Sequence, residues 1–183
     1  FGFGCLRGLG AAYWFALRPR HLRWGAEPAE VKAFWPGDDL VPRPQVSATH
    51  AVTIQAPRDK VWPWLVQIGQ GRGGFYSYEF IENAMGLNIE NAERIIPQWQ
   101  NLQVGDAVPL APGGAMDVPV AILDPQRAVV LHADSRLPNP NGQGGPPLPP
   151  GQFLAVSWGF YLNEQAGGAT RLREDLRDRE RQG

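Results

Sequence analysis

The chain has 183 residues, of which 43% are apolar and 19% are charged, and its net charge is −1. This balance is typical of one globular domain with a hydrophobic core and excludes a disordered chain. The near-zero charge excludes a strongly basic nucleic-acid-binding protein. The single cysteine, Cys5, excludes an internal disulfide and a cysteine-based zinc site, and is compatible with a reducing compartment.

The first 23 residues join an apolar, glycine-rich stretch, Phe1 to Leu17, to a basic flank. This pattern predicts the end of a membrane-spanning helix with positive charges on its cytoplasmic side. The spacing of Gly4 and Gly8 also fits a close contact between membrane helices. An ordinary amphipathic or signal-like segment is the alternative. We expect residues 1–17 to be helical and to project from the domain.

Residues 24–45 are interrupted by several prolines and predict a connector with little regular structure. Val46 to Ile54 alternates apolar and polar residues, which predicts a first strand. A helix follows from Arg58, with Val61, Leu65 and Ile68 on one face and Gly69 as its C-cap. A glycine loop, residues 69–74, then leads to a second helical stretch at Tyr78 to Met85.

After Pro97 the pattern changes to short apolar runs separated by turn residues. One strand, two helices and then a series of strands predict an α+β domain. We expect the strands to form one antiparallel sheet with the helices at one end of it. The Pro- and Gly-rich stretch Leu137 to Gly151 predicts a loop, with a polyproline II ligand as the alternative. The predicted strands are 107–110, 118–123, 128–132, 153–162 and 170–172.

Two stretches resemble a known family. The first opens with Ala56-Pro57 and Val61-Trp62 and continues through Trp62-Pro63-Trp64-Leu65 to Tyr76-Ser77-Tyr78. The second comprises Ile81-Glu82-Asn83, the run from Asn91 to Pro97, and Val104-Gly105-Asp106. Together they resemble an uncharacterised bacterial branch of the SRPBCC superfamily, which includes START lipid-transfer domains, Bet v 1 and polyketide cyclases.

The resemblance implies a helix-grip fold, in which a curved antiparallel sheet grips a long C-terminal helix with a cavity between them. Here the sequence after Leu172 is highly charged, so the long helix is predicted to be missing. The predicted organisation is residues 1–23 as the end of a membrane helix with its basic flank, 24–45 as connector, 46–172 as the SRPBCC-like domain and 173–183 as a charged tail.

The sequence gives little support for known nucleotide-binding, zinc-binding or catalytic motifs. Gly69 to Gly74 matches G-x-G-x-x-G, but a helical pattern precedes it where a dinucleotide site requires a strand. His21, His50 and His132 have no zinc-ligand spacing. His132 could project into the cavity as a general base, and the alternative, which we favour, is a surface histidine or one with satisfied hydrogen bonds. We therefore expect no metal, no cofactor and no defined catalytic residue.

The best candidate for the polar end of the cavity is Arg72, because a glycine-rich loop lets the backbone approach a ligand closely. A buried guanidinium requires a partner, which we expect to be Glu79, Glu82 or a ligand anion. The predicted ligand-binding residues are Arg72, Tyr76, Tyr78, Glu82, Asn83, Trp99, His132 and Trp158.

The predicted function is binding, or transport, of a hydrophobic or amphipathic small molecule such as a lipid. One alternative is an enzyme of polyketide-cyclase or isomerase type that uses the same cavity. Another is a membrane-tethered interaction domain without a ligand. The predicted location is the cytoplasm or the cytoplasmic face of the inner membrane, with membrane contact through the N-terminal segment and no nucleic-acid partner.

Overall fold

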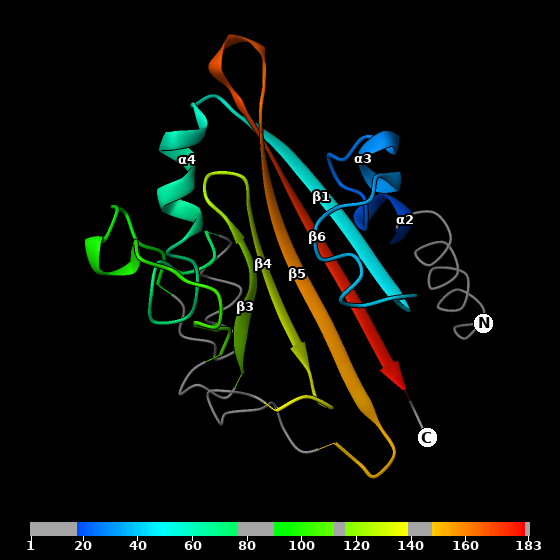
Figure 1. Ribbon diagram of the computed structural model, residues 1–183. Coiled ribbons are helices and arrows are strands. Elements are labelled where there is room, and N and C mark those ends of the chain that lie inside the picture. Colours follow the sequence, from blue (N-terminus) through cyan, green and yellow to red (C-terminus); the bar gives the residue numbers. More distant parts are fainter. Residues whose placement is uncertain (1–17, 77–89, 112–115, 139–147, 182–183) are drawn as a thin grey trace, which may run out of the picture.

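A computed structural model describes residues 18–76, 90–111, 116–138 and 148–181 (Figure 1). The predicted helical segments Phe1 to Leu17 and Tyr78 to Met85 lie outside these ranges. No helix within the described ranges is long and apolar enough to cross a membrane. The elements are α2 (Arg18–His21), α3 (Pro28–Lys32), β1 (Val46–Ile54), α4 (Arg58–Leu65), η2 (Pro97–Trp99), β2 (Ala107–Pro109), β3 (Asp117–Asp124), β4 (Ala128–Asp134), β5 (Phe153–Glu164), η4 (Ala166–Gly168) and β6 (Thr170–Arg181).

The strands form one six-stranded antiparallel sheet in the order β1-β6-β5-β4-β3-β2. β1 pairs with β6 over its full length, from Val46 opposite Asp178 to Ile54 opposite Thr170. β6 pairs on its other side with β5, so the last strand lies inside the sheet beside the first strand. The predicted α+β architecture with a single antiparallel sheet is confirmed.

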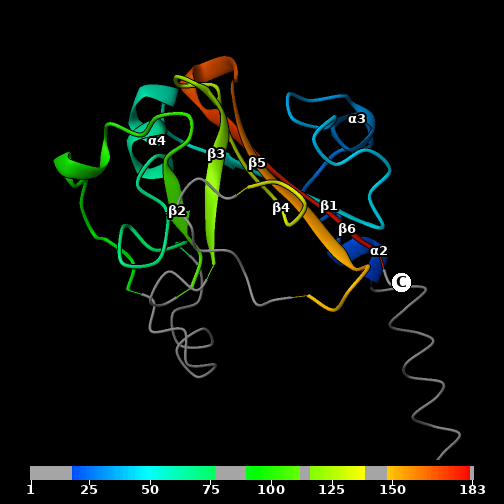
Figure 2. The same ribbon diagram turned by 60° about the horizontal axis from the view of Figure 1, so that its bottom comes forward.

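The sheet has two differently covered faces, because successive side chains of a strand point to opposite sides. Val129, Leu131, Phe160 and Leu162 point to one face and form a core with Val61 and Leu65 of α4. Ala128, Val130 and Tyr161 point to the other face and contact Trp35 and Leu40, which lie between α3 and β1. Figure 2 shows α4 and α3 on opposite sides of the sheet.

Helix α4 is shorter than the sequence predicts. It follows Pro57 and ends at Leu65, with Val66 as its C-cap, so the predicted C-cap at Gly69 is wrong. Pro63 lies inside the helix and removes one backbone donor from its last turns. The Arg72 guanidinium donates to the Val66 carbonyl at 2.9 Å, which satisfies one carbonyl that the helix end leaves free.

The predicted charged tail is wrong from residue 173 onward, because this segment continues β6 to Arg181. Arg173 is 1% exposed, and its guanidinium lies 4.1 Å from the ring centre of Trp35 and 5.1 Å from that of Tyr161. It also forms an ion pair with Asp175 at 3.0 Å. A strand rich in charge is therefore stable inside the sheet, because aromatic rings and a carboxylate compensate its cation.

The predicted connector is an ordered layer over the same face, and we call residues 22–45 the N-terminal strap. Alternate residues of β6 point toward it and hold it at successive places. Arg171 forms a two-pronged ion pair with Glu30, with N–O distances of 2.8 and 2.7 Å. Arg179 donates to the Pro42 carbonyl at 3.0 Å. Further contacts join Arg173 to Trp35 and Arg177 to Asp38.

Candidate functional site

The glycine loop, residues 69–74, is a closed turn. Gly69 and Gly74 exchange backbone hydrogen bonds of 2.9 and 3.1 Å. The amide of Arg72 donates to the Gly69 carbonyl, and the amide of Gly73 donates to the Gln67 carbonyl. Because these amides are used inside the turn, and α4 rather than a strand precedes it, the G-x-G-x-x-G pattern does not form a phosphate-binding cradle.

Gln67 connects the loop to the rest of the domain. Its side chain is fully buried and its amide nitrogen donates to the Tyr76 hydroxyl at 2.7 Å and to the Arg94 carbonyl at 3.2 Å. Its amide oxygen accepts from the Ile96 amide at 3.0 Å. These bonds satisfy the buried amide and fix residues 94–96 against the end of α4.

The loop ends by placing two aromatic rings on the α4 side of the sheet. Tyr76 lies edge-on to Trp64, with ring centres 5.7 Å apart. Phe75 lies 6.0 Å from Trp158, whose other neighbour, Phe160, is 4.8 Å away. These spacings are typical of favourable aromatic pairs, so the loop extends the apolar core toward β5.

Trp158 contacts a small cluster of polar side chains that comes from β6 and β1. Its indole nitrogen donates to Glu174 Oε1 at 2.7 Å. The other oxygen, Oε2, lies 3.5 Å from Nδ1 of His50, and Nε2 of His50 lies 3.0 Å from the His21 carbonyl. An imidazolium at His50 would donate to both of these acceptors. We call Trp158, Glu174 and His50 the polar trio.

Exposed or partly exposed apolar side chains lie on the same sheet face as the polar trio. The strand register places Val52 opposite Leu172, next to the His50–Glu174 pair, and places Leu154 opposite Glu180, farther along the same face. Val52 is 43% exposed and Leu154 is 39% exposed, although both point to the face that carries the core further along the sheet. We call this region the open sheet face, which comprises Val46, Val52, Leu154, Trp158, Leu172 and Leu176.

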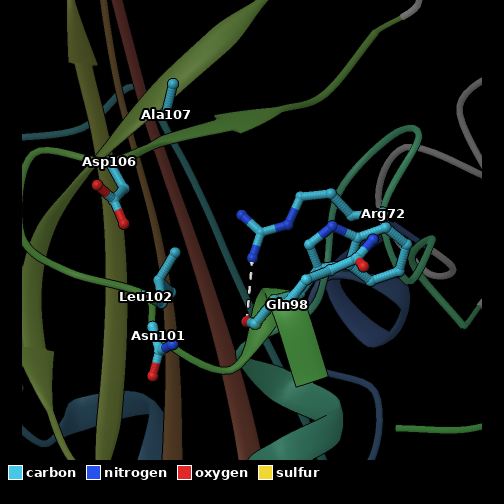
Figure 3. A pocket seen from close by; sticks show the side chains of 7 residues that line it. Arg72, Gln98, Asn101, Leu102, Asp106 and Ala107 are labelled. Carbon is cyan, nitrogen blue, oxygen red and sulfur yellow. Dashed lines mark hydrogen bonds between the residues drawn. The ribbon is translucent and has the colours of Figure 1, made fainter. Parts of the chain in front are cut away.

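A second region, the Arg72 pocket, lies between the glycine loop, η2 and the start of β2 (Figure 3). It has a volume of about 330 Å³ and is open to solvent. Its walls include Arg72, Trp99, Gln98, Asn101, Leu102 and Asp106. In Figure 3 the guanidinium of Arg72 extends into the pocket, and the carboxylate of Asp106 lies on the opposite wall.

The partners of Arg72 within the described part of the chain are two backbone carbonyls, and its predicted carboxylate partners stay a prediction. Nη2 donates to the carbonyls of Val66 and Trp99, at 2.9 and 3.4 Å, whereas Glu79 and Glu82 lie outside the described residues. Nε is buried without a hydrogen-bond partner. Burial lowers the pKa of Arg72, and the negative charge of Asp106 raises it in part.

The predicted site residues fall into different regions. Arg72 and Trp99 line the pocket, Trp158 lies on the open sheet face, and Tyr76 packs near the end of α4. Tyr78, Glu82 and Asn83 lie outside the described residues. The expectation that His132 enters the cavity is wrong, because it lies opposite Ser157 on the strap side of the sheet and contacts the Val156 carbonyl at 2.9 Å.

Sequence reasoning missed Glu174, His50 and Asp106 as site residues. Glu174 was assigned to a tail, so its position opposite His50 in the sheet was invisible. Asp106 lies in the family-like motif Val104-Gly105-Asp106, but the motif alone does not show that it faces Arg72. Among the described residues, no cluster of three His, Cys, Asp or Glu side chains could hold a metal ion.

Comparisons with known proteins give only distant structural similarities. No family model matches the chain, and no curated protein matches it. Protein MLL2253 from Mesorhizobium loti is 17% identical, with a TM-score of 0.38 over 72% of this chain and 75% of that one. Protein Mll3558 from Rhizobium loti is 16% identical, with a TM-score of 0.40 over 75% of this chain and 81% of that one. These similarities are too weak to assign a family or a function.

Proposed function

We propose that this chain is a ligand-binding domain of the SRPBCC type, which holds an amphipathic small molecule against the open sheet face. The observation that carries the proposal is a partly exposed carboxylate, Glu174, on a sheet face where three adjacent strands carry exposed or partly exposed apolar side chains. The α+β fold, with α4 against one face of an antiparallel sheet, supports the helix-grip assignment. The family-like motif from Ala56 through Tyr78 supports it as well.

The apolar part of the ligand would supply most of the affinity. Val52, Leu154 and their neighbours leave hydrocarbon surface in contact with water, and a ligand would cover it. Each ~100 Å² of apolar surface removed from water contributes about 2.5 kcal/mol before the costs of association. A ligand with a saturated chain or a ring system fits this surface.

The polar trio would set the orientation of the ligand. Glu174 is about one-third exposed, at 34%, and accepts only one close hydrogen bond from within the trio, from Trp158. A carboxylate has lone pairs for further donors, so it can accept from a ligand hydroxyl or ammonium group. The proposed ligand is therefore an apolar molecule with a hydrogen-bond donor, rather than a fatty acid anion.

The geometry favours binding over catalysis. His50 and Glu174 form the only acid–base pair described on the open sheet face, and both are about one-third exposed, at 35% and 34%. Proton transfer by such a pair is most efficient in a site that excludes water. A cyclase or isomerase activity therefore has less support than binding.

The test is calorimetric titration of the full chain with decylamine, decanol and decanoate, which share one chain length and differ in their polar group. Decylamine and decanol should bind more tightly than decanoate, and Glu174→Gln should remove the preference for decylamine. Val52→Ser should weaken binding of the probes that bind. Val104→Ser is the matched control, because Val104 is exposed outside the open sheet face. Equal effects of the two valine substitutions would contradict the proposal.

A second function, attachment to an anionic membrane surface, is favoured by a different part of the molecule. Trp24 is 66% exposed and Phe34 is 76% exposed, both on the N-terminal strap. The exposed cations Arg20, Arg23 and Lys32 lie close to them in sequence. Aromatic side chains next to basic residues are typical of proteins that bind the interface of an anionic bilayer.

Co-sedimentation of the full chain with vesicles tests this second function. Binding should be stronger to vesicles that contain phosphatidylglycerol than to pure phosphatidylcholine, and should weaken at high salt. Replacing Trp24 and Phe34 by alanine should reduce binding about tenfold, the equivalent of about 1.4 kcal/mol. Leu137→Ala is the control, since Leu137 is an exposed apolar residue outside the strap. Binding that ignores lipid charge, or a double variant that binds like the wild type, would exclude the strap as the attachment surface.

A further inference from the structure

We propose that the Arg72 pocket binds a small zwitterion, a molecule that carries a carboxylate and, a few bonds away, an ammonium group. This site is separate from the open sheet face, and its ligand would be polar rather than amphipathic. The starting point is the charge of Arg72, which has no carboxylate within ion-pair distance among the described residues. Its partners among the described residues are two backbone carbonyls, both bound through Nη2.

The guanidinium is thus incompletely satisfied. Its Nε is buried without a hydrogen-bond partner, and burial lowers its pKa, so the charged form is under electrostatic strain from desolvation. Two neutral carbonyls offset part of that cost, but a carboxylate offsets more, because charge-assisted bonds are roughly twice as strong as neutral ones. A ligand carboxylate at the end of the guanidinium that extends into the pocket would supply such a charge-assisted bond.

Asp106 determines the second charge of the ligand. Figure 3 places its carboxylate across the pocket from the guanidinium, and its charge raises the pKa of Arg72. One carboxyl oxygen accepts the Gln103 amide at 2.8 Å, which holds the side chain in place. A simple anion would be attracted by Arg72 and repelled by Asp106. A simple cation would be attracted by Asp106 and repelled by Arg72. A ligand with both charges is attracted by both walls.

The size and lining of the pocket limit the ligand further. A volume of about 330 Å³ lies at the small end of ligand sites, which span ~300–1,000 Å³. Gln98 and Asn101 add amide donors and acceptors, whereas Leu102 supplies little apolar surface because it is buried. The pocket therefore fits an amino-acid-sized molecule with a small or polar side group, and does not fit a long hydrocarbon chain.

The experiment is a titration of the full chain with glycine, acetate and methylamine, followed by calorimetry and by the ¹⁵Nε–H resonance of Arg72. Glycine should shift this resonance and bind about tenfold more tightly than acetate, with methylamine weakest. Asp106→Asn should weaken glycine binding about tenfold and leave acetate binding unchanged or stronger. The amide oxygen of the substituted residue still accepts the Gln103 amide, so the fold should be retained. Asp124→Asn is the matched control, because Asp124 is an exposed aspartate at the end of β3.

Three results would overturn the proposal. They are equal binding of glycine and acetate, an Asp106→Asn variant that binds glycine like the wild type, and no response to glycine at millimolar concentrations. The last result would mean that water alone fills the pocket. None of these results bears on the open sheet face, because Val52 and Glu174 take no part in the titration.

Discussion

Asp38 offers a direct test of how the N-terminal strap is held on the sheet. Its side chain is 5% exposed, accepts the backbone amide of Trp35 at 3.0 Å and forms an ion pair with Arg177 at 2.7 Å. Asp38→Ala removes both interactions at once. It leaves the Arg177 guanidinium with Asp175 at 3.4 Å, and it leaves the Trp35 amide without its acceptor.

The expected loss is about 3 kcal/mol of unfolding free energy. Removing one partner of a buried ion pair costs about 3–5 kcal/mol, and Arg177 is partly exposed, which places the loss at the lower end. The backbone bond to Trp35 is included in this figure, since such a bond contributes about 1 kcal/mol. Urea unfolding followed by circular dichroism measures the change. Asp39→Ala is the control and should change stability by less than about 0.5 kcal/mol, because Asp39 is exposed.

The pH dependence gives a second measurement on the same residue. Burial raises the pKa of Asp38 above its usual value of 3.8, even though Arg177 and the Trp35 amide stabilise the carboxylate. The folded chain therefore binds this proton more tightly than the unfolded chain does. The resulting stability is complete below pH 3.8 and is lost as the pH rises through the folded pKa. Relative to Asp38→Asn, the wild type should gain stability as the pH falls from neutral through this window.

Two results would refute this account of the strap. An Asp38→Ala variant as stable as Asp39→Ala would show that the ion pair contributes nothing. A difference in unfolding free energy between the wild type and Asp38→Asn that does not change with pH would show that burial does not raise the pKa of Asp38.

Substitutions at Glu30, Gly73 and Gln67 test other parts of the structure. Glu30→Gln should destabilise the fold at neutral pH, because the hydrogen bond from Arg171 lowers the pKa of Glu30. This loss of stability should vanish as the pH falls below 4.5 through the pKa of the folded state. A loss in thermal melts that does not change with pH would contradict this prediction. Gly73→Ala should lower the unfolding free energy in urea by about 2–4 kcal/mol, because the new Cβ would lie 2.7 Å from the Gln67 carbonyl oxygen. Gly71→Ala is the comparison: its Cβ would meet no atom, so it should cost only about 1 kcal/mol for the positive φ. Gln67→Leu should cost about 3 kcal/mol and raise the amide exchange rate of Ile96, and unchanged exchange would show that Gln67 does not hold that segment.

The sequence predicts most strands because their alternation is local. The predicted range of β1 matches the structure, and the predicted β2 to β5 each fall within three residues of the observed bounds. β6 was predicted to end at Leu172, because the residues after it are charged. Some of the groups that compensate them come from distant parts of the chain: Pro42, whose carbonyl accepts from Arg179, lies 137 positions away. No pattern within β6 reveals such partners.

The candidate site was harder to predict than the fold, because it depends on which face a side chain takes. β4 is apolar at Ala128, Val129, Val130 and Leu131, so its alternation does not show which residues meet α4. The prediction for His132 was wrong for this reason. Trp158 was among the predicted site residues, but its partner Glu174 depends on the pairing of β5 with β6. Arg72 was predicted from its glycine-rich surroundings. The carboxylate of Asp106 that faces it is seen only in the structure.

The place of β6 between β1 and β5 determines the order in which the chain can fold during synthesis. Thr49 on β1 and Asp175 on β6 are hydrogen-bonded although they are 126 positions apart. β1 leaves the ribosome long before its partner strand does, because the two strands lie so far apart in the chain. Until then β1 and β5 each expose an unpaired edge, and contacts between distant residues form slowly. The nascent chain should therefore depend on chaperones that cover these edges, and ribosome-bound chains arrested before Thr170 should be protease-sensitive throughout β1.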